Sequence, residues 1–243
     1  MKRETVYWLA YGAVALLAVT HPPGVRNPPT VPPKGPGKPP AGPPKKPPPK
    51  PSGGGRQGDV ISYVVDSSTG LIIVKTAESP DVAWGAPEVA PDKIPSFQTM
   101  LRNWGALVDE AGSDLRVPSK EIWAIMWSES GCNPNAKSPA GAEGLMQVMP
   151  FHFPAGMSET QMRDPRTNIR TGVGVMASRR AGGSRDIVQV ASLYNAGGNP
   201  DGSPFTNAQR PNLATRWGYA SEPGYIDSVV AAYNTAAKLG VVA

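Results

Sequence analysis

The feature that most constrains this chain is a proline-rich segment near its N-terminus. Of the 29 prolines, 15 lie within residues 21–51. Proline fixes one backbone angle and removes a hydrogen-bond donor, so this stretch belongs to no packed domain. An extended chain rises about 3.1 Å per residue, so roughly 30 residues can reach some 90 Å. We interpret residues 22–58 as a Pro/Lys-rich extended linker; the alternatives are a docking strip for an aromatic groove or an electrostatic tether to an anionic polymer.

The same segment accounts for the positive charge of the chain. Residues 21–51 carry six Lys or Arg side chains and no acid, whereas the formal net charge of the whole chain is +5. The rest of the chain therefore sums to about −1 by subtraction. A folded domain without a basic surface is not expected to bind nucleic acid. Nucleic-acid binding through the Lys- and Pro-rich residues 21–51 is a weak alternative.

Cysteine and histidine are too scarce for most metal or haem sites. The chain has one cysteine, Cys132, and two histidines, His21 and His152, far apart in sequence. A single cysteine excludes an intrachain disulfide, and this set makes a zinc or haem site unexpected. We therefore expect no metal and no cofactor.

Residues 1–21 have the layout of a targeting segment. Lys2 and Arg3 precede an uncharged, mostly apolar run over residues 6–20. As a helix this run would span about 22 Å, short of the roughly 30 Å hydrocarbon core, although Tyr7 and Trp8 suit a membrane interface. We favour a membrane anchor through residues 6–20 over a cleaved secretory signal, and either of them over a buried core helix.

Residues 59–95 are predicted to form a β-hairpin followed by a linker. Two β-rich runs, 60–65 and 71–76, flank turn-forming residues at 66–70. This pattern is typical of a hairpin, and because an isolated hairpin is marginal in water, we expect it to dock on another element. Residues 78–95 are punctuated by proline and are interpreted as linker; no chemistry is assigned to them.

Residues 96–243 are predicted to be mainly α-helical, with five helices. Each carries apolar residues at i, i+3, i+4 and i+7 spacing. Their expected limits follow from caps and breakers: a first helix capped by Ser96; a second over 120–130, capped by Ser119 and ended by Gly131; a third over 168–180; a fourth from near Ser184; and a fifth from Ser221, with Pro223 in its first turn. The polar loop between Asn195 and Trp217 is expected to form a lid or a groove wall.

The second predicted helix places one carboxylate on its apolar side. Ile122, Ile125 and Met126 define that side, and Glu129 follows four residues after Ile125. Burial and the negative end of the helix dipole disfavour a charged carboxylate, so its pKa should rise. A neutral, partly buried carboxylic acid is what a general acid near neutral pH requires. Glu129 is therefore the candidate catalytic residue; the alternative is a glutamate at a fraying helix end, turned to solvent.

Residues 129–150, ESGCNPNAKSPAGAEGLMQVMP, resemble the signature of the Slt-type lytic transglycosylases, relatives of goose-type lysozyme that cleave bacterial peptidoglycan. Further blocks match in the same order and are, in turn, Asp164-Pro165 with Asn168-Ile169 and Gly172; Ala191 with Tyr194-Asn195-Ala196-Gly197; and Tyr225 with Val229. The resemblance covers roughly the last 150 residues. It implies a lysozyme-like helical catalytic domain over residues 96–243.

The resemblance also implies which side chains meet the substrate. In the family, the serine equivalent to Ser138 points toward the catalytic acid, and Gln147 and Met146 line the sugar groove. Gln147 would then hydrogen-bond hydroxyl or N-acetyl groups, while Met146 packs against a ring face or, alternatively, fills the core. Tyr194 would place its hydroxyl beside Glu129.

Other positions of the motifs have less direct roles. Asn195 and Tyr225 complete the candidate substrate-binding set, although Asn195 is better explained as shaping the turn that follows it. Glu143 occupies a variable position of the motif and is expected to be solvated. Cys132 replaces a residue that is often aromatic in the family, and Gly144 is expected to permit a positive φ and close backbone contact.

The mechanism implied by the resemblance uses one acid. Most glycosidases need two carboxylates, but no motif places a second one near Glu129, and Asp164 is carried over as a structural cap of the third helix. Glu129 would protonate the glycosidic oxygen between N-acetylmuramic acid and N-acetylglucosamine, and the C6 hydroxyl would close a 1,6-anhydro ring. The alternatives are a lysozyme-like hydrolase of the same bond and an inactive peptidoglycan-binding module.

These inferences place the protein at a cell envelope. Its expected partner is the peptidoglycan glycan strand, with the membrane contacted through residues 6–20. A membrane-anchored enzyme, an enzyme secreted to the periplasm, a secretion-channel helper and a phage component that opens the wall during entry all agree with the sequence. Other envelope or virion proteins are compatible partners.

Overall fold

The computed structural model of the chain describes residues 61–75, 85–181 and 185–241, all within a unit that spans Ser52–Ala243. The predicted targeting segment (residues 1–21) and the proline-rich linker (22–58) lie outside the described residues. In the part of the chain that is described, no helix has the length and apolar character needed to cross a membrane.

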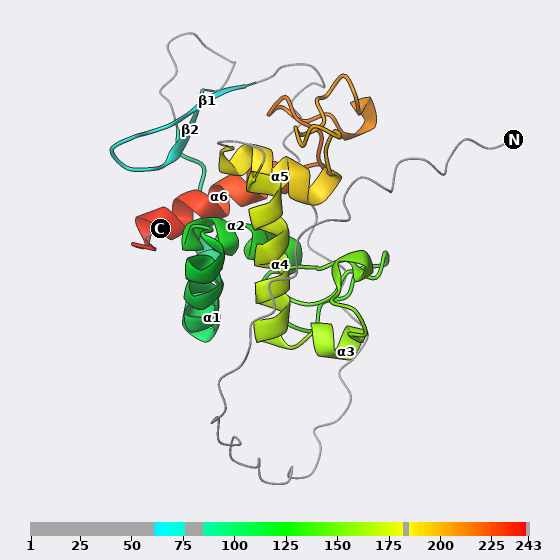
Figure 1. Cartoon of the computed structure of the whole chain (residues 1–243). Helices are drawn as coiled ribbons and strands as arrows, with labels where there is room; N and C mark the ends of the chain where they lie inside the picture. The colour runs from blue at the N-terminus through cyan, green and yellow to red at the C-terminus, as the bar shows by residue number, and fades with distance from the viewer. Residues whose placement is uncertain (1–60, 76–84, 182–184, 242–243) are drawn as a thin grey trace, which may run out of the picture. The chain divides into compact units, whose positions relative to one another are not determined.

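The described residues are mainly helical, as the sequence predicts (Figure 1). Short 3₁₀ turns at Pro91–Lys93, Pro150–His152 and Pro211–Leu213 supplement the main elements. In chain order these elements are β1 (Ser62–Val65), β2 (Ile72–Lys75), α1 (Ile94–Leu115), α2 (Ser119–Ser130), α3 (Glu159–Met162), α4 (Pro165–Arg180), α5 (Ile187–Ala196) and α6 (Tyr225–Lys238).

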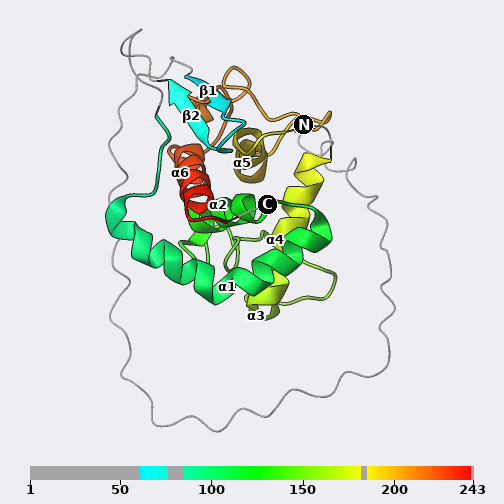
Figure 2. The same ribbon diagram turned by 90° about the vertical axis from the view of Figure 1, so that its left-hand side faces the viewer.

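Helix α2 is the centre of the helical layer. It packs against α1 and α6 (Figure 2). Around it, α1 contacts α4, α4 contacts α5, and α5 contacts α6. Its residues from Ile122 to Met126 are all buried. A helix that is apolar around most of its circumference is stable only when other helices surround it, which explains its central place.

The first two helices begin differently from the prediction. Helix α1 starts at Ile94 rather than after a Ser96 cap, because the 3₁₀ turn at Pro91–Lys93 leads directly into it and Pro95 is tolerated in a first turn. Helix α2 takes Pro118 as its N-cap. The hydroxyl of Ser119 instead donates to Asp109 Oδ1 at 2.8 Å, so neither serine is a cap. Gly131 ends α2 with a φ of 57°, as predicted.

Aspartates start the next two long helices. Asp164 Oδ1 accepts the Thr167 N–H at 2.9 Å, which confirms the predicted cap and begins α4 at Pro165, before the expected Asn168. Asp186 accepts the Gln189 N–H at 3.0 Å and caps α5. The fourth helix was expected to begin near Ser184, which lies outside the described residues, and α5 begins at Ile187.

Helix α6 begins at Tyr225, later than the predicted Ser221. The backbone N–H of Ser221 donates to the Leu213 carbonyl at 2.9 Å, and that of Glu222 donates to Asn195 Oδ1 at 2.8 Å. Gly224 then takes a φ of 77°, in the left-handed region. These tertiary bonds and this backbone angle keep residues 221–224 out of the helix.

The predicted hairpin forms and docks on α6. Strands β1 and β2 pair antiparallel, and both views place the hairpin beside one end of α6 (Figures 1 and 2). Ile72 is fully buried, and its backbone N–H and carbonyl both bond the side-chain amide of Asn234 on α6 at 2.8 Å. The residues that follow also pack: the Val89 N–H donates to Thr235 Oγ1 at 2.9 Å. Residues 87–89 of the expected linker therefore pack on α6, and residues 91–95 form the 3₁₀ turn and the start of α1 instead of a linker.

The segment between Asn195 and Trp217 is folded on itself. It contains the 3₁₀ turn at Pro211–Leu213, and its end residue Trp217 is buried. The side-chain amide of Asn207 bonds the backbone of Thr215 in both directions, at 2.7 and 3.0 Å. These contacts give the loop a defined shape; its function as a lid or groove wall stays a prediction.

Candidate active site

Glu129 occupies the last turn of α2, where it is partly buried. Its carboxyl Oε1 accepts a hydrogen bond of 2.6 Å from the hydroxyl of Tyr225, the first residue of α6. Burial raises the pKa of Glu129 to about 7, and the hydrogen bond from Tyr225 acts in the opposite direction. The predicted rise in the pKa of this carboxyl is thus confirmed, with burial as its main cause.

The surroundings of Glu129 hold neutral groups rather than cations. Among the described residues, no Lys, Arg or His side chain forms an ion pair with its carboxylate. The hydroxyls of Tyr194 and Tyr225 both have pKa values well above the usual one, because they are buried and because the charge of Glu129 lies close to them. An acid in such a niche can hold its proton near neutral pH and can also release it.

Tyr194 is not the tyrosine that bonds Glu129. Its hydroxyl donates to the Met146 carbonyl at 2.8 Å. The Tyr194 hydroxyl still lies close enough to Glu129 to feel its charge, as expected, but the hydrogen bond to the carboxyl comes from Tyr225. The two tyrosines come from α5 and α6 and enter the same niche, so which of them bonds Glu129 depends on how these helices pack and not on either local sequence.

The loop after α2, residues 131–149, is fastened by side chains that were expected to bind sugar. Ser138 Oγ accepts the Ala142 N–H at 3.0 Å, and no hydrogen bond to Glu129 is found for it among the described residues. Met146 is fully buried. A Cβ on Gly172 would lie 2.6 Å from Met146 Sδ, which shows how closely this side chain packs on α4. Met146 therefore fills the core, the alternative considered for it, and does not face a sugar.

Gln147 has an unusual backbone and a partly used amide. Its φ of 45° lies in the left-handed region, which side-chain-bearing residues enter at a cost. Its Nε2 donates to the carbonyls of Ala136 at 3.2 Å and Gly144 at 3.0 Å. Both amide hydrogens are thereby occupied, and Oε1 is the atom left to accept a hydrogen bond.

Asn195 and Ser130 join elements around the site. Asn195 Oδ1 accepts from the Ser221 hydroxyl at 3.0 Å and from the Glu222 N–H at 2.8 Å, so it ties the end of α5 to the segment before α6. Ser130 Oγ donates to the Leu145 carbonyl at 2.7 Å and accepts the Cys132 N–H at 3.0 Å. Ser130 was not among the predicted site residues, although its place next to Glu129 was a usable signal.

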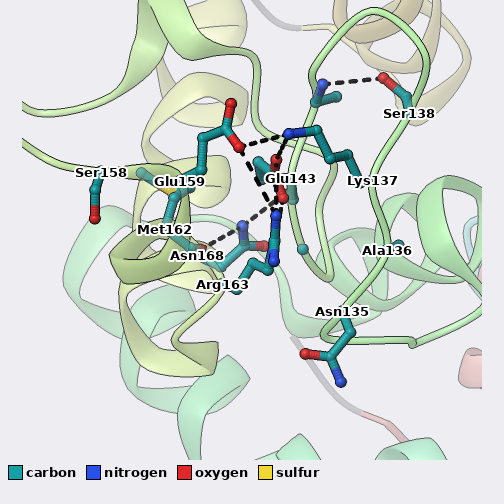
Figure 3. Close-up of polar contacts among 12 residues, drawn as sticks. Asn135, Ala136, Lys137, Ser138, Glu143, Ser158, Glu159, Met162, Arg163 and Asn168 are labelled. Atoms are coloured by element: carbon teal, nitrogen blue, oxygen red, sulfur yellow. Dashed lines mark hydrogen bonds and ion pairs between the residues drawn. The ribbon is translucent and has the colours of Figure 1, made fainter. Parts of the chain in front are cut away.

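Glu143 corrects the prediction of a solvated side chain. It is fully buried, and its carboxylate pairs with Arg163 at 2.5 Å and with Lys137 at 3.1 Å (Figure 3). Arg163 holds the pKa of Glu143 below its usual value through their hydrogen bond. A buried carboxylate is tolerated only with such partners, and they come from the C-cap of α3 and from an earlier part of the loop.

Metal ligands do not cluster here: within residues 61–75, 85–181 and 185–241, no group of three or more His, Cys, Asp or Glu side chains could hold a metal ion. No carboxylate other than that of Glu129 itself contributes to its pKa shift. The arrangement that remains is a single acid with a raised pKa, hydrogen-bonded by Tyr225, beside a loop whose backbone is tightly held.

Part of the chain is similar in sequence to known proteins. Residues 106–216 match the family model for the transglycosylase SLT domain. Over 94 residues the chain is 38% identical to the soluble lytic murein transglycosylase of Escherichia coli K12, a match that covers 35% of this chain and 15% of that protein. It is 32% identical over 92 residues to the membrane-bound lytic murein transglycosylase E of Buchnera aphidicola, covering 34% of this chain and 42% of that protein.

Among solved structures, the 70-kDa soluble lytic transglycosylase Slt70 of Escherichia coli aligns with a TM-score of 0.44 and 28% identity, over 56% of this chain and 24% of that one. The aligned regions thus span less than half the length of each of these relatives. The matched range includes Glu129, the loop after α2, and the Tyr194-Asn195 pair. Residues 106–216 of the chain are therefore similar to the transglycosylase SLT domain.

Proposed function

We propose that this protein is a peptidoglycan lytic transglycosylase with a lysozyme-like catalytic domain over residues 96–243. It cleaves the β-1,4 bond between N-acetylmuramic acid and N-acetylglucosamine and leaves a 1,6-anhydro end. The observation that carries the proposal is the partly buried Glu129, whose pKa is raised to about 7 and whose partner is the Tyr225 hydroxyl. The transglycosylase SLT match over residues 106–216 supports the choice of substrate and reaction.

In the first step Glu129 acts as a general acid. Its neutral carboxyl gives a proton to the glycosidic oxygen as the bond from that oxygen to C1 of the muramic acid breaks. The substrate's own 2-acetamido group stabilises the positive charge that develops on C1. No second carboxylate is required, which agrees with the neutral surroundings of Glu129.

In the second step the same residue acts as a general base. The Glu129 carboxylate takes the proton of the C6 hydroxyl, and this oxygen bonds to C1 and closes the anhydro ring. The acid is restored and no water enters the products. A pKa near the working pH makes both forms of Glu129 accessible, and Tyr225 stabilises the carboxylate between the two steps.

Of the candidate substrate-binding residues, we assign direct contact to Gln147. Its two amide hydrogens are used within the loop, so it would accept a hydrogen bond from a sugar hydroxyl or an N-acetyl N–H through Oε1. Ser138, Met146, Tyr194 and Asn195 are assigned supporting roles, because their side chains already bond or pack against the protein.

We further propose that the enzyme works at the cell envelope. An anchor through residues 6–20 and an extended linker over 22–58 would let a membrane-attached domain reach the wall. Fractionation of cells that express the full chain tests this: an anchored protein stays with membranes after a salt wash, whereas a cleaved signal releases it in a shorter form. Recovery in virus particles would identify the phage alternative.

The reaction is tested by incubating the full chain with purified peptidoglycan and analysing the products by mass spectrometry. A lytic transglycosylase releases anhydromuropeptides, each lighter by one water molecule than the reducing products of a hydrolase. Glu129→Gln keeps the side chain's shape and removes its acidic proton, so this variant should bind peptidoglycan and release products at least about 100-fold more slowly. Reducing ends from the unaltered protein would identify a hydrolase, and binding without cleavage would identify an inactive module.

A further inference from the structure

The loop over residues 131–149 contains a buried ion pair that the proposed reaction does not use. Glu143 is fully buried, whereas Lys137 and Arg163 reach it from partly exposed positions. Arg163 makes a two-point contact, with Nε 2.5 Å from Oε2 and Nη2 3.3 Å from Oε1 of Glu143. Lys137 Nζ lies 3.1 Å from Oε1 (Figure 3). The pair therefore attaches the middle of the loop to the end of α3.

The backbone on either side of Glu143 is fixed by Asn168 of α4. The buried amide of Asn168 donates to the Glu143 carbonyl at 2.8 Å, and its Oδ1 accepts the Met146 N–H at 2.8 Å. Gly144 makes this contact possible, because a Cβ there would lie 2.4 Å from Asn168 Nδ2 and its φ is 75°. Residues 143–146 are thus held on their α4 side by both charge and hydrogen bonds.

The same short strip contacts the catalytic niche. The Leu145 carbonyl accepts the Ser130 hydroxyl at 2.7 Å, directly after Glu129. The Met146 carbonyl accepts the Tyr194 hydroxyl at 2.8 Å. The Gly144 carbonyl accepts the Gln147 amide at 3.0 Å. Residues 143–147, which we call the bridging strip, therefore connect the buried ion pair with the end of α2 and with Tyr194 of α5.

We propose that Glu143 and Arg163 are positioning residues, which hold the bridging strip in place so that a sugar bound at Gln147 meets Glu129. This inference rests on the proposed function. A fully buried carboxylate is strongly unfavourable without its partner, so the strip is held where Glu143 meets Arg163. A shift of the strip by about 1 Å would move Gln147 relative to the acid, and misplacement of that size can cost on the order of 10²-fold in rate.

The test compares Glu143→Gln with Glu159→Gln. Glu159 belongs to the same cluster, with Lys137 Nζ at 2.5 Å and Arg163 Nη2 at 3.9 Å, but its side chain is 52% exposed. At a temperature where circular dichroism shows both variants folded, we expect Glu143→Gln to lower kcat for peptidoglycan about 10- to 100-fold and Glu159→Gln to change it less than about twofold. Equal kcat values for the two variants would overturn the proposal.

A double variant separates positioning from simple stability. Replacing both Glu143 and Arg163 by methionine removes the charges and keeps apolar volume, which commonly preserves folding. A positioning role predicts that the double variant folds and stays slow, since methionines cannot reproduce the two-point contact. Full recovery of kcat together with folding would show that the pair only stabilises the chain. Should Glu143→Gln fail to fold, this double variant decides the question.

A readout without substrate keeps this inference apart from the proposed function. The Met146 N–H donates to Asn168 Oδ1, and the Val148 N–H donates to the Glu143 carbonyl at 3.0 Å. Hydrogen exchange of these two amides should quicken in folded Glu143→Gln and stay unchanged in Glu159→Gln. Unchanged exchange in both variants would overturn the positioning role even in a chain that cleaves no peptidoglycan. Absence of anhydro products from the unaltered protein would instead overturn the proposed function.

Discussion

Glu129 and Glu143 are two carboxyl groups withdrawn from water in adjacent parts of one motif, and the protein treats them in opposite ways. Glu129 meets a tyrosine hydroxyl and no cation, and its pKa is raised to about 7 by burial. Glu143 meets Arg163 and Lys137, and its pKa is lowered although the side chain is fully buried. Burial alone therefore does not decide the charge of a carboxyl group; a cation beside it does. One group is suited to proton transfer and the other to holding a loop.

The largest expected effect comes from removing the acid. Glu129→Gln should lower kcat/KM for peptidoglycan by about 10²- to 10⁴-fold, the usual contribution of a general acid. Release of soluble muropeptides measures it, and Glu159→Gln serves as a control that alters an exposed glutamate outside the niche. Cleavage that survives the loss of Glu129 would mean that Glu129 is not the general acid.

The next largest effect comes from removing the arginine beside Glu143, so that this carboxyl, like Glu129, is buried without an arginine partner. Arg163→Met leaves a buried carboxylate with only Lys137, and the free energy of unfolding at pH 7 should fall by about 3 kcal/mol. In the unaltered protein the folded pKa of Glu143 is depressed, so its pairing stabilises above the unfolded pKa and is lost as pH falls. The deficit of the variant should therefore shrink in acid.

Urea unfolding followed by circular dichroism measures this difference. The matched control is Arg170→Met, because Arg170 pairs with Asp114 at 2.7 Å while both side chains are about half exposed. That variant should lose less than about 1 kcal/mol. Similar losses in the two variants would mean that the Glu143 pair contributes no more than a surface contact.

Local sequence rules predicted which helices exist better than where they start. Apolar spacing identified all five long helices, because a helix buries one side whatever its neighbours do. Asp164 also signalled its own cap correctly. The start of α6 could not be found in this way, since Asn195 and Leu213 hold Ser221 and Glu222 through tertiary bonds.

In the candidate site, too, the features set by local sequence were predicted and those set by tertiary contacts were not. Glu129 was found from periodicity and the motif, and its raised pKa follows from local burial. The hydrogen bond from Tyr225 to Glu129 and the burial of Glu143 depend on partners brought together only by folding. Nothing in the sequence around Glu143 points to Arg163, which comes from the end of α3. The substrate contacts of Gln147 stay a prediction.

The pH dependence of stability distinguishes Glu129 from Glu143 without any substrate. The folded pKa of Glu129 is about 7 and its ordinary value is 4.5, so this group favours the folded state below pH 4.5 and loses that contribution as pH rises through 7. Glu129→Gln removes the effect. Relative to the unaltered protein, the variant should gain up to about 3 kcal/mol in unfolding free energy between pH 4 and pH 8.

The difference between the two proteins, measured by urea unfolding at each pH, cancels the titration of all other groups. A gain in the opposite direction would mean that Glu129 is preferentially ionised in the folded state, as Glu143 is. A difference that does not change with pH would mean that burial leaves the Glu129 carboxyl unaffected.

The smallest expected effect comes from removing the Tyr225 hydroxyl, the hydrogen-bond partner of Glu129. Tyr225 donates to Glu129 Oε1 at 2.6 Å, which stabilises the carboxylate and lowers its pKa. Tyr225→Phe should therefore raise the pKa of Glu129 above about 7 and shift the alkaline limb of the kcat/KM profile to higher pH, with a free-energy change of about 1 kcal/mol. Tyr194→Phe is the matched control, because the Tyr194 hydroxyl bonds the Met146 carbonyl instead. A larger shift from Tyr194→Phe than from Tyr225→Phe would mean that Tyr194 of α5, and not Tyr225 of α6, is the hydrogen-bond partner of Glu129.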